Sequence, residues 1–250
     1  MFDELQVPSG KAEVQNIGNA LEAAVVADLV PLRPDLVIAR SQPAVGFEQY
    51  RHLSVSADFT KVYKGDLSAL EQAINMLDRL PKNAEIRAVL RTLKRASKVA
   101  LADDQRVQKL IRMLPEESLL RLDIAVTAPS TAQRLLVGVS AKWSLRTDRA
   151  QDCIAQGGKL VALRRGHMPH YAVLTMEPRP SMLRLLAYGS GSLDCVYHLA
   201  LDELVLAAKT LATKRNKADW PARMLLERMV LQDRIRPYQA LVDEVKRLSA

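Results

Sequence analysis

The segment from residue 137 to residue 149, VGVSAKWSLRTDR, constrains the fold of this chain more than any other. Its first half has apolar residues at Val137 and Val139, which predicts a buried strand. The alternation of that strand puts Ser140 and Lys142 together on one face. The second half places two guanidinium groups around one carboxylate, directly before a predicted helix. A lysine-bearing strand that leads directly into charged residues is unusual for a protein core. It is a reasonable way to hold a reactive lysine beside a group of charges.

Composition and charge limit the class of protein. The chain has 250 residues, of which 48% are hydrophobic and 26% charged, so it can bury a substantial core in one large domain or two small ones. The formal net charge is +8 and the pI is about 9.6, which favours an anionic partner. Nucleic acid is the leading candidate for that partner, although many other proteins have a basic pI.

The sequence lacks the patterns of several other classes. Two cysteines, Cys153 and Cys195, make neither a disulfide framework nor a metal-ligand cluster, and the four histidines lack zinc-binding spacing. The first residues, MFDE, do not resemble a signal peptide, and no apolar run approaches the roughly 20 residues that span a bilayer. We therefore expect no membrane partner and a cytoplasmic location.

The periodicity predicts an α/β protein in which a small mixed β-sheet is flanked by helices. We expect a single domain over residues 1–250, with a helical N-terminal part (1–115), a core (116–205) and a helical C-terminal part (206–250). Strands are expected at residues 36–38, 119–126, 134–142, 171–176 and 195–199, the second and third forming an antiparallel pair through a turn at 127–132.

Helices are expected between and around these strands. Their predicted ranges are 12–29, a segment containing 47–53, 66–80, one or two helices within 82–113, 148–156 ending at Gly157-Gly158, and a helix after Pro180. Beyond the last predicted strand the chain is expected to be helical, with breaks at Pro221 and Pro237. The helices of 82–113 carry a dense basic cluster, either a solvated face or a phosphate-binding surface.

Three residues of the predicted core fit the needs of phosphodiester cleavage. That reaction needs a metal held by carboxylate oxygens, an activated water and a cation near the developing negative charge. Asp123 and Lys142 lie on adjacent predicted strands with eighteen residues between them, and Ser140 shares a face with Lys142. The pattern resembles the PD-(D/E)xK nuclease core with serine at the usual acidic position. By itself it also occurs by chance, as solvated charges at strand ends.

Further motifs strengthen this resemblance. The residues from Lys142 onward, KWSLRTDR, resemble the signature of the type II restriction endonucleases that cut CCGG-containing sites. Residues 164–170 (RRGHMPH), 177–181 (EPRPS) and 189–198 (GSGSLDCVYH) are also similar to that family, and 47–53 (FEQYRHL) more faintly. The resemblance covers residues 119–205 well. It implies a restriction-endonuclease-like core and Mg²⁺-dependent hydrolysis of double-stranded DNA at a CCGG palindrome, with GCCGGC as one candidate. It also implies a homodimer or homotetramer.

The resemblance also implies roles for individual residues. Asp123, Ser140 and Lys142 would be catalytic, together with Glu48. Asp123 would also bind the metal. The three DNA-reading residues would be Arg146 and Arg149, each donating to a guanine, and Asp148, accepting from cytosines. The alternative for these three is an internal ion-pair network at the start of a helix.

The sequence departs from the family at the second metal ligand. Relatives have an acid fourteen residues after the lysine, where this chain has Gln156, whose amide oxygen binds Mg²⁺ more weakly than a carboxylate. Either the site works with fewer charges, or Glu48 or another acid compensates, or cleavage is impaired, naturally or by an engineered change. The alternative functions are therefore a DNA-binding protein with weakened or absent cleavage and another PD-(D/E)xK nuclease. A lesser departure is Leu122, where the family has proline before the aspartate.

Overall fold

The computed structural model describes residues 14–81, 83–113, 120–129, 133–189, 191–217 and 219–249. The chain divides into two compact units, one made of residues 1–52 and 119–250 and the other of residues 53–118. Each unit is described by itself below. The single domain expected over residues 1–250 stays a prediction.

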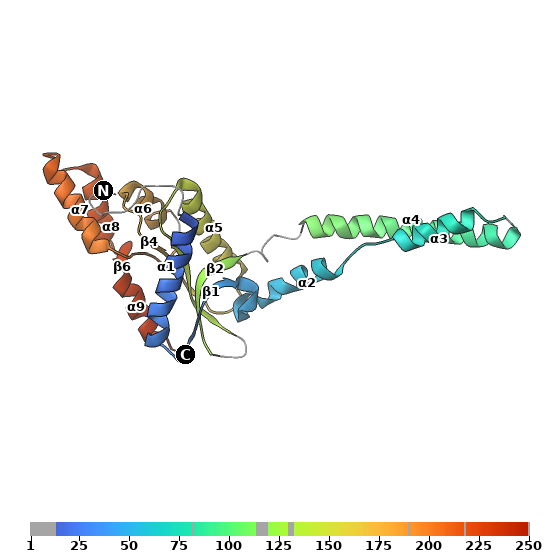
Figure 1. Cartoon of the computed structure of the whole chain (residues 1–250), viewed down its shortest axis with the longest axis horizontal. Helices are drawn as coiled ribbons and strands as arrows, with labels where there is room; N and C mark the ends of the chain where they lie inside the picture. Colours follow the sequence, from blue (N-terminus) through green and yellow to red (C-terminus); the bar gives the residue numbers. More distant parts are fainter. Residues whose placement is uncertain are drawn as a thin grey trace. The chain divides into compact units, whose positions relative to one another are not determined.

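The larger unit is built on a six-stranded sheet in the order β1-β2-β3-β4-β5-β6 (Figure 1). The strands are β1 (Val37–Pro43), β2 (Arg121–Thr127), β3 (Leu135–Lys142), β4 (His170–Thr175), β5 (Cys195–His198) and β6 (Ile235–Pro237). The first three strands pair antiparallel and the last three join in parallel, so β3 is the strand at which the direction of pairing changes. The mixed α/β fold and the predicted β2–β3 pair are confirmed. The predicted turn lies partly outside the described residues, at 130–132.

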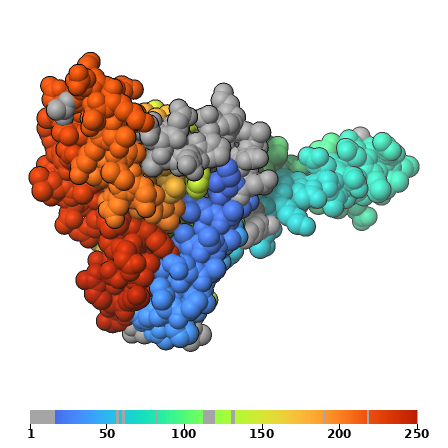
Figure 2. Space-filling view, turned by 60° about the vertical axis from the view of Figure 1, so that its left-hand side comes forward, coloured from blue at the N-terminus to red at the C-terminus, as the bar shows by residue number. Residues whose placement is uncertain are grey.

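Helices cover both faces of this sheet. They are α1 (Val14–Leu29), α5 (Thr147–Leu163), α6 (Pro180–Ala187), α7 (Leu201–Lys214), α8 (Pro221–Leu231) and α9 (Tyr238–Arg247), with short 3₁₀ turns η1 (Val30–Leu32), η2 (Ala44–Gly46) and η3 (Glu48–Leu53). One core lies between the sheet and α1 and α9, which Figure 2 shows side by side, and includes Leu29, Val139 and Leu241. The second core lies on the opposite face and includes Cys153 of α5 and Met229 of α8. The sheet is therefore the middle of three layers.

The predicted end of α5 at Gly157-Gly158 is wrong, because the helix continues to Leu163. Gly157 is buried, and a Cβ atom there would lie 2.7 Å from the carbonyl oxygen of Ser192 and 2.9 Å from the ring of Tyr171. Glycine at this position allows a close approach of neighbouring segments and does not terminate the helix.

One further difference lies elsewhere in the larger unit. The segment 48–53 is helical as predicted, in the form of the 3₁₀ helix η3. Strand β6 lies in a segment that was expected to be helical, although α8 and α9 do begin at or just after Pro221 and Pro237. A three-residue strand is too short to show a period of two in the sequence.

The smaller unit is helical and consists of α2 (Ser54–Val62), α3 (Ser68–Asp78) and α4 (Ala84–Met113). The predicted helices of 82–113 form one helix of 30 residues. The carboxylate of Asp66 accepts a hydrogen bond from the backbone N–H of Ser68 at 2.9 Å, as expected for a residue at the start of α3. Among the described residues, none of the helices is both long enough and apolar enough to cross a bilayer.

Candidate active site

Adjacent strands bring Asp123 of β2 together with Ser140 and Lys142 of β3. One carboxylate oxygen of Asp123, Oδ2, accepts hydrogen bonds from Lys142 Nζ at 2.6 Å, Ser140 Oγ at 3.1 Å and the backbone N–H of Ala141 at 2.9 Å. The antiparallel register next to this point pairs Ile124 with Val139, which sets Asp123 beside Ser140. The structure thus joins three of the predicted catalytic residues into one cluster.

This cluster is open to solvent on one side. The side chains of Asp123 and Lys142 each keep 25% of their surface exposed, so a ligand can reach both. Ser140 is buried, and the thiol of Cys153 lies 3.6 Å from its hydroxyl. Burial raises the pKa of the Cys153 thiol above its usual value, so it stays protonated and neutral near pH 7. The charges of the cluster therefore come from the lysine and the aspartate.

The donor set of Asp123 fits a magnesium ion, although it is small. The hydrogen bonds described for Asp123 all end on Oδ2, so its other oxygen can bind a cation. Mg²⁺ is often bound by one or two carboxylates, with waters and substrate phosphate oxygens completing its shell. Within the described residues, no group of three or more histidine, cysteine, aspartate or glutamate side chains is arranged to hold a metal. Asp123 would therefore supply most of the protein's negative charge to the ion.

Gln156 is held between two protein groups beside this cluster. Its side-chain N–H donates to the backbone carbonyl of Arg121, and its Oε1 accepts from the hydroxyl of Tyr171 at 2.7 Å. Burial raises the pKa of Tyr171, so its hydroxyl stays protonated and acts as a donor. An amide both donates and accepts, which a carboxylate cannot do. The surroundings of Gln156 therefore match glutamine in their hydrogen bonding.

Glu48 lies on η3, and its side chain is exposed. The neighbouring amide of Gln49 bonds both backbone groups of Leu135, donating at 2.7 Å and accepting at 3.0 Å. Leu135 begins β3 and Lys142 ends it, and seven residues of strand correspond to about 23 Å. These contacts place the η3 segment beside the opposite end of β3 from Lys142. The catalytic role of Glu48 stays a prediction, and this geometry counts against it.

The three predicted DNA-reading residues lie at the start of α5. Arg146 precedes the first turn and pairs with Asp148 at 3.1 Å, and the two side chains keep 68% and 62% of their surface exposed. An ion pair this exposed contributes little to stability, so both groups can exchange it for a ligand. Arg149 is half-buried and lines a pocket of about 290 Å³ that Lys142 and Trp143 also line. The structure thus brings Arg149 next to the lysine.

The same pocket contains two acids that sequence reasoning missed, Glu22 of α1 and Asp152 of α5. The Glu22 carboxylate accepts from Arg40 Nη2 of β1 at 3.2 Å and keeps 16% of its surface exposed. Glu22 lies about a hundred residues before Asp123, on a helix whose other charged residue is Asp28. Nothing in the local sequence indicates that Glu22 lies near the strand that carries the lysine.

The buried carboxylate of Glu177 fixes the loop between β3 and α5. Glu177 is fully buried, and its carboxylate accepts from the backbone N–H of Leu145 at 2.7 Å and from Arg179 Nε at 2.6 Å. The carbonyl of Trp143 accepts from the N–H of Met176 at 3.2 Å. The segment after β4 therefore holds the residue directly before Arg146. The motif at 177–181 was recognised from the sequence, but this contact was not predicted.

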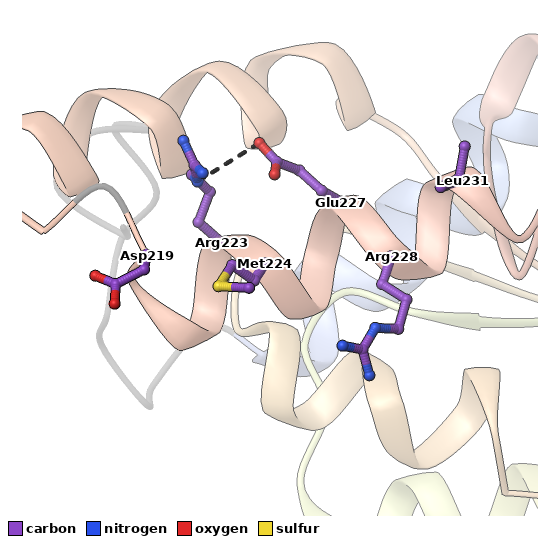
Figure 3. Close-up of a pocket in the computed structure, with 6 residues that line it drawn as sticks. All are labelled: Asp219, Arg223, Met224, Glu227, Arg228 and Leu231. Carbon is purple, nitrogen blue, oxygen red and sulfur yellow. Dashed lines mark ion pairs between the residues drawn. The ribbon is translucent and has the colours of Figure 1, made fainter.

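Another pocket lies along α8 and is formed by Asp219, Arg223, Met224, Glu227, Arg228 and Leu231 (Figure 3). Arg223 and Glu227 approach each other to 3.6 Å along one side of the helix. None of these residues belongs to the cluster around Asp123, so this pocket is separate from the candidate active site.

Comparisons with known proteins agree with this geometry. A family model described as NgoMIV restriction enzyme matches residues 99–241. Over 70 residues the chain is 49% identical to a type II restriction enzyme, NgoMIV of Neisseria gonorrhoeae. That alignment covers 28% of this chain and 24% of the relative's length.

Proposed function

Because the chain belongs to the NgoMIV restriction enzyme family, we propose that it is a type II restriction endonuclease acting on double-stranded DNA. It hydrolyses phosphodiester bonds at a palindrome that contains CCGG, with GCCGGC as one candidate site. The observation that carries this proposal is the cluster of Asp123, Ser140 and Lys142, followed within one loop by Arg146.

The residues of the cluster have separate tasks in this reaction. Lys142 is held at 2.6 Å from Asp123, where its ammonium can stabilise negative charge on the scissile phosphate and orient a water for attack. Asp123 anchors the lysine through Oδ2 and offers its other oxygen to Mg²⁺. When bound, Mg²⁺ supplies positive charge at the phosphate and lowers the pKa of a coordinated water. Ser140 holds the carboxylate in place by donating to Oδ2.

Base reading is assigned to the residues at the start of α5. Arginine donates bidentately to guanine O6 and N7, and a carboxylate accepts from cytosine N4 in the major groove. Arg146 and Arg149 would read the guanines and Asp148 the cytosines of CCGG. The exposure of the Arg146–Asp148 pair supports this role, because both groups can leave each other at small cost. A palindromic site has two identical halves, so we expect two copies of the chain to bind it, as a homodimer or within a homotetramer.

The second candidate is a DNA-binding protein in which cleavage is weakened or absent. The observation that favours it is Gln156, a neutral residue with both ends of its amide engaged, at the place where relatives have an acidic ligand. The charge for Mg²⁺ then comes from Asp123, without the acid that relatives have at the position of Gln156. The cytoplasmic location expected from the sequence stays a prediction under both candidates.

A plasmid assay separates these candidates. One plasmid contains CCGG sites and a matched plasmid has none, and each is incubated with the protein with and without Mg²⁺. Site-dependent linearisation that requires Mg²⁺ supports the proposed endonuclease. Sequence-specific binding without cleavage supports the second candidate. Cleavage of both plasmids at equal rates would point to a nuclease that does not read CCGG.

A further inference from the structure

Helix α4 carries two lengthwise stripes with the 3-4 spacing of a coiled coil. The first includes Leu90, which is buried, and Asp104, whose carboxylate accepts from the hydroxyl of Tyr63 at 2.9 Å, so this stripe faces the chain around α3. Ile74 of α3 is buried on the same side. Together α3 and α4 form a helical hairpin that uses only one side of α4.

The second stripe lies on an exposed side of α4. It consists of Val89, Thr92, Ala96, Val99, Asp103, Arg106 and Leu110, at intervals of three and four residues. The apolar members Val89, Val99 and Leu110 keep 50%, 57% and 56% of their surface exposed. A heptad pattern on a helix surface buries its apolar residues against another helix. A partner helix would cover these apolar residues.

The charged residues within the stripe indicate which helix could pair with it. Its charged members, Asp103 and Arg106, pair with each other at 2.8 Å on the exposed surface. In a parallel, in-register pair of two α4 helices, Asp103 would face Asp103 and Arg106 would face Arg106. In an antiparallel pair centred between Asp104 and Gln105, Asp103 faces Arg106 and Val99 faces Leu110. The stripe is therefore complementary to itself in one orientation.

Other basic residues of α4 lie outside the stripe, to which Arg106 belongs. Arg91, Arg95, Lys98 and Lys109 are exposed outside the stripe, where they remain accessible to an anion such as DNA phosphate. The stripe is nearly neutral in charge, so nucleic acid is not the ligand that it fits. A second copy of α4 pairs the charged positions with each other and Val99 with Leu110, while Val89 and Thr92 lie beyond the overlap of the two helices.

We propose that the α4 stripe is a self-association surface, on which a second copy of this chain docks with its α4 antiparallel. The inference deepens the proposed function, since it rests on the expectation that a palindromic site requires more than one copy. The Asp103–Arg106 layers fix the register and the orientation, as polar layers do in coiled coils. The Val99–Leu110 layers supply apolar burial on either side.

The test uses charge reversal in the whole chain and measures mass by sedimentation equilibrium. Asp103→Arg and Arg106→Asp each place like charges opposite one another, so each variant alone should halve the sedimenting mass and raise the dissociation constant at least about tenfold. Mixing the two variants in equal amounts should restore the wild-type mass, because the new arginine at position 103 of one copy then faces the new aspartate at position 106 of the other.

Lys98→Asp is the matched control, with the same change of charge as Arg106→Asp on the basic face of α4, and it should leave the mass unchanged. Helicity measured by circular dichroism shows whether each variant keeps α4. A wild-type chain that sediments as a monomer overturns the proposal, as do single variants with unchanged mass. Loss of mass that mixing does not restore also overturns it. Because DNA cleavage is not measured, failure here is distinct from failure of the proposed function.

Discussion

We predict that removing the buried carboxylate of Glu177 lowers the free energy of unfolding substantially. In Glu177→Ala, the backbone N–H of Leu145 loses its acceptor in a fully buried position, which costs about 1–3 kcal/mol. Arg179 loses the carboxylate too, but its side chain is 44% exposed and can turn toward water, so its contribution is about 1 kcal/mol or less. We therefore expect a total loss of about 1–4 kcal/mol, a large part of the free energy of unfolding of an ordinary domain.

Urea unfolding followed by circular dichroism measures this loss as a lower midpoint with an unchanged m-value. Glu177→Gln is the matched control, because its amide oxygen still accepts from Leu145, while its NH2 replaces the oxygen that accepts from the backbone N–H and Nε of Arg179. That variant should lose about 1 kcal/mol. A loss below about 1 kcal/mol in Glu177→Ala would refute the reasoning, since water would then replace the carboxylate at no cost.

Three further predictions concern the proposed cleavage. Asp123→Asn and Lys142→Ala should each abolish Mg²⁺-dependent cleavage and leave DNA binding measurable by gel shift, and near-native cleavage by either variant would remove that residue from the mechanism. Gln156→Glu should raise the cleavage rate, because a carboxylate binds Mg²⁺ more strongly than an amide. A lower rate, with Glu48→Ala also inactive, would assign the missing charge to Glu48. Arg149→Ala should lose about 1–3 kcal/mol of discrimination per contact between CCGG and scrambled duplexes in competition binding at fixed salt. Equal loss on both duplexes would assign Arg149 to phosphate.

The central part of the fold was predictable because strand periodicity is a geometric property. Side chains two residues apart lie on the same face of a strand, so Ser140 and Lys142 had to share a face wherever β3 lay in the sheet. The antiparallel pairing with β2 followed from the short connection between the two predicted strands. The approach of Asp123 to Lys142 could therefore be inferred from the sequence.

Contacts between distant segments were not predictable in the same way. Gly157 has the pattern of a helix end, and only the approach of Tyr171 and Ser192 shows why glycine is needed inside α5. Glu22 lies in a segment with no distinguishing pattern, and the motif around Glu177 does not show which backbone group its carboxylate would bind. Their roles depend on residues that are distant in the sequence and adjacent in the fold. The hydrophobic periodicity of a strand or helix, 2 or 3.6 residues, gives no information about such neighbours.

The change of pairing direction at β3 has a mechanical consequence. Hydrogen bonds on both edges hold this strand, antiparallel to β2 and parallel to β4, so it cannot slide without breaking two ladders. A slip of one residue would turn Lys142 to the other face of the sheet. The residues proposed to read bases continue from the end of the same strand, at Arg146. On the proposed function, an incorrect base that shifted the backbone at Arg146 would shift the end of β3, which carries the lysine, as well. A wrong site is then penalised once in binding and again in the chemical step, so cleavage should discriminate between sequences more sharply than affinity does.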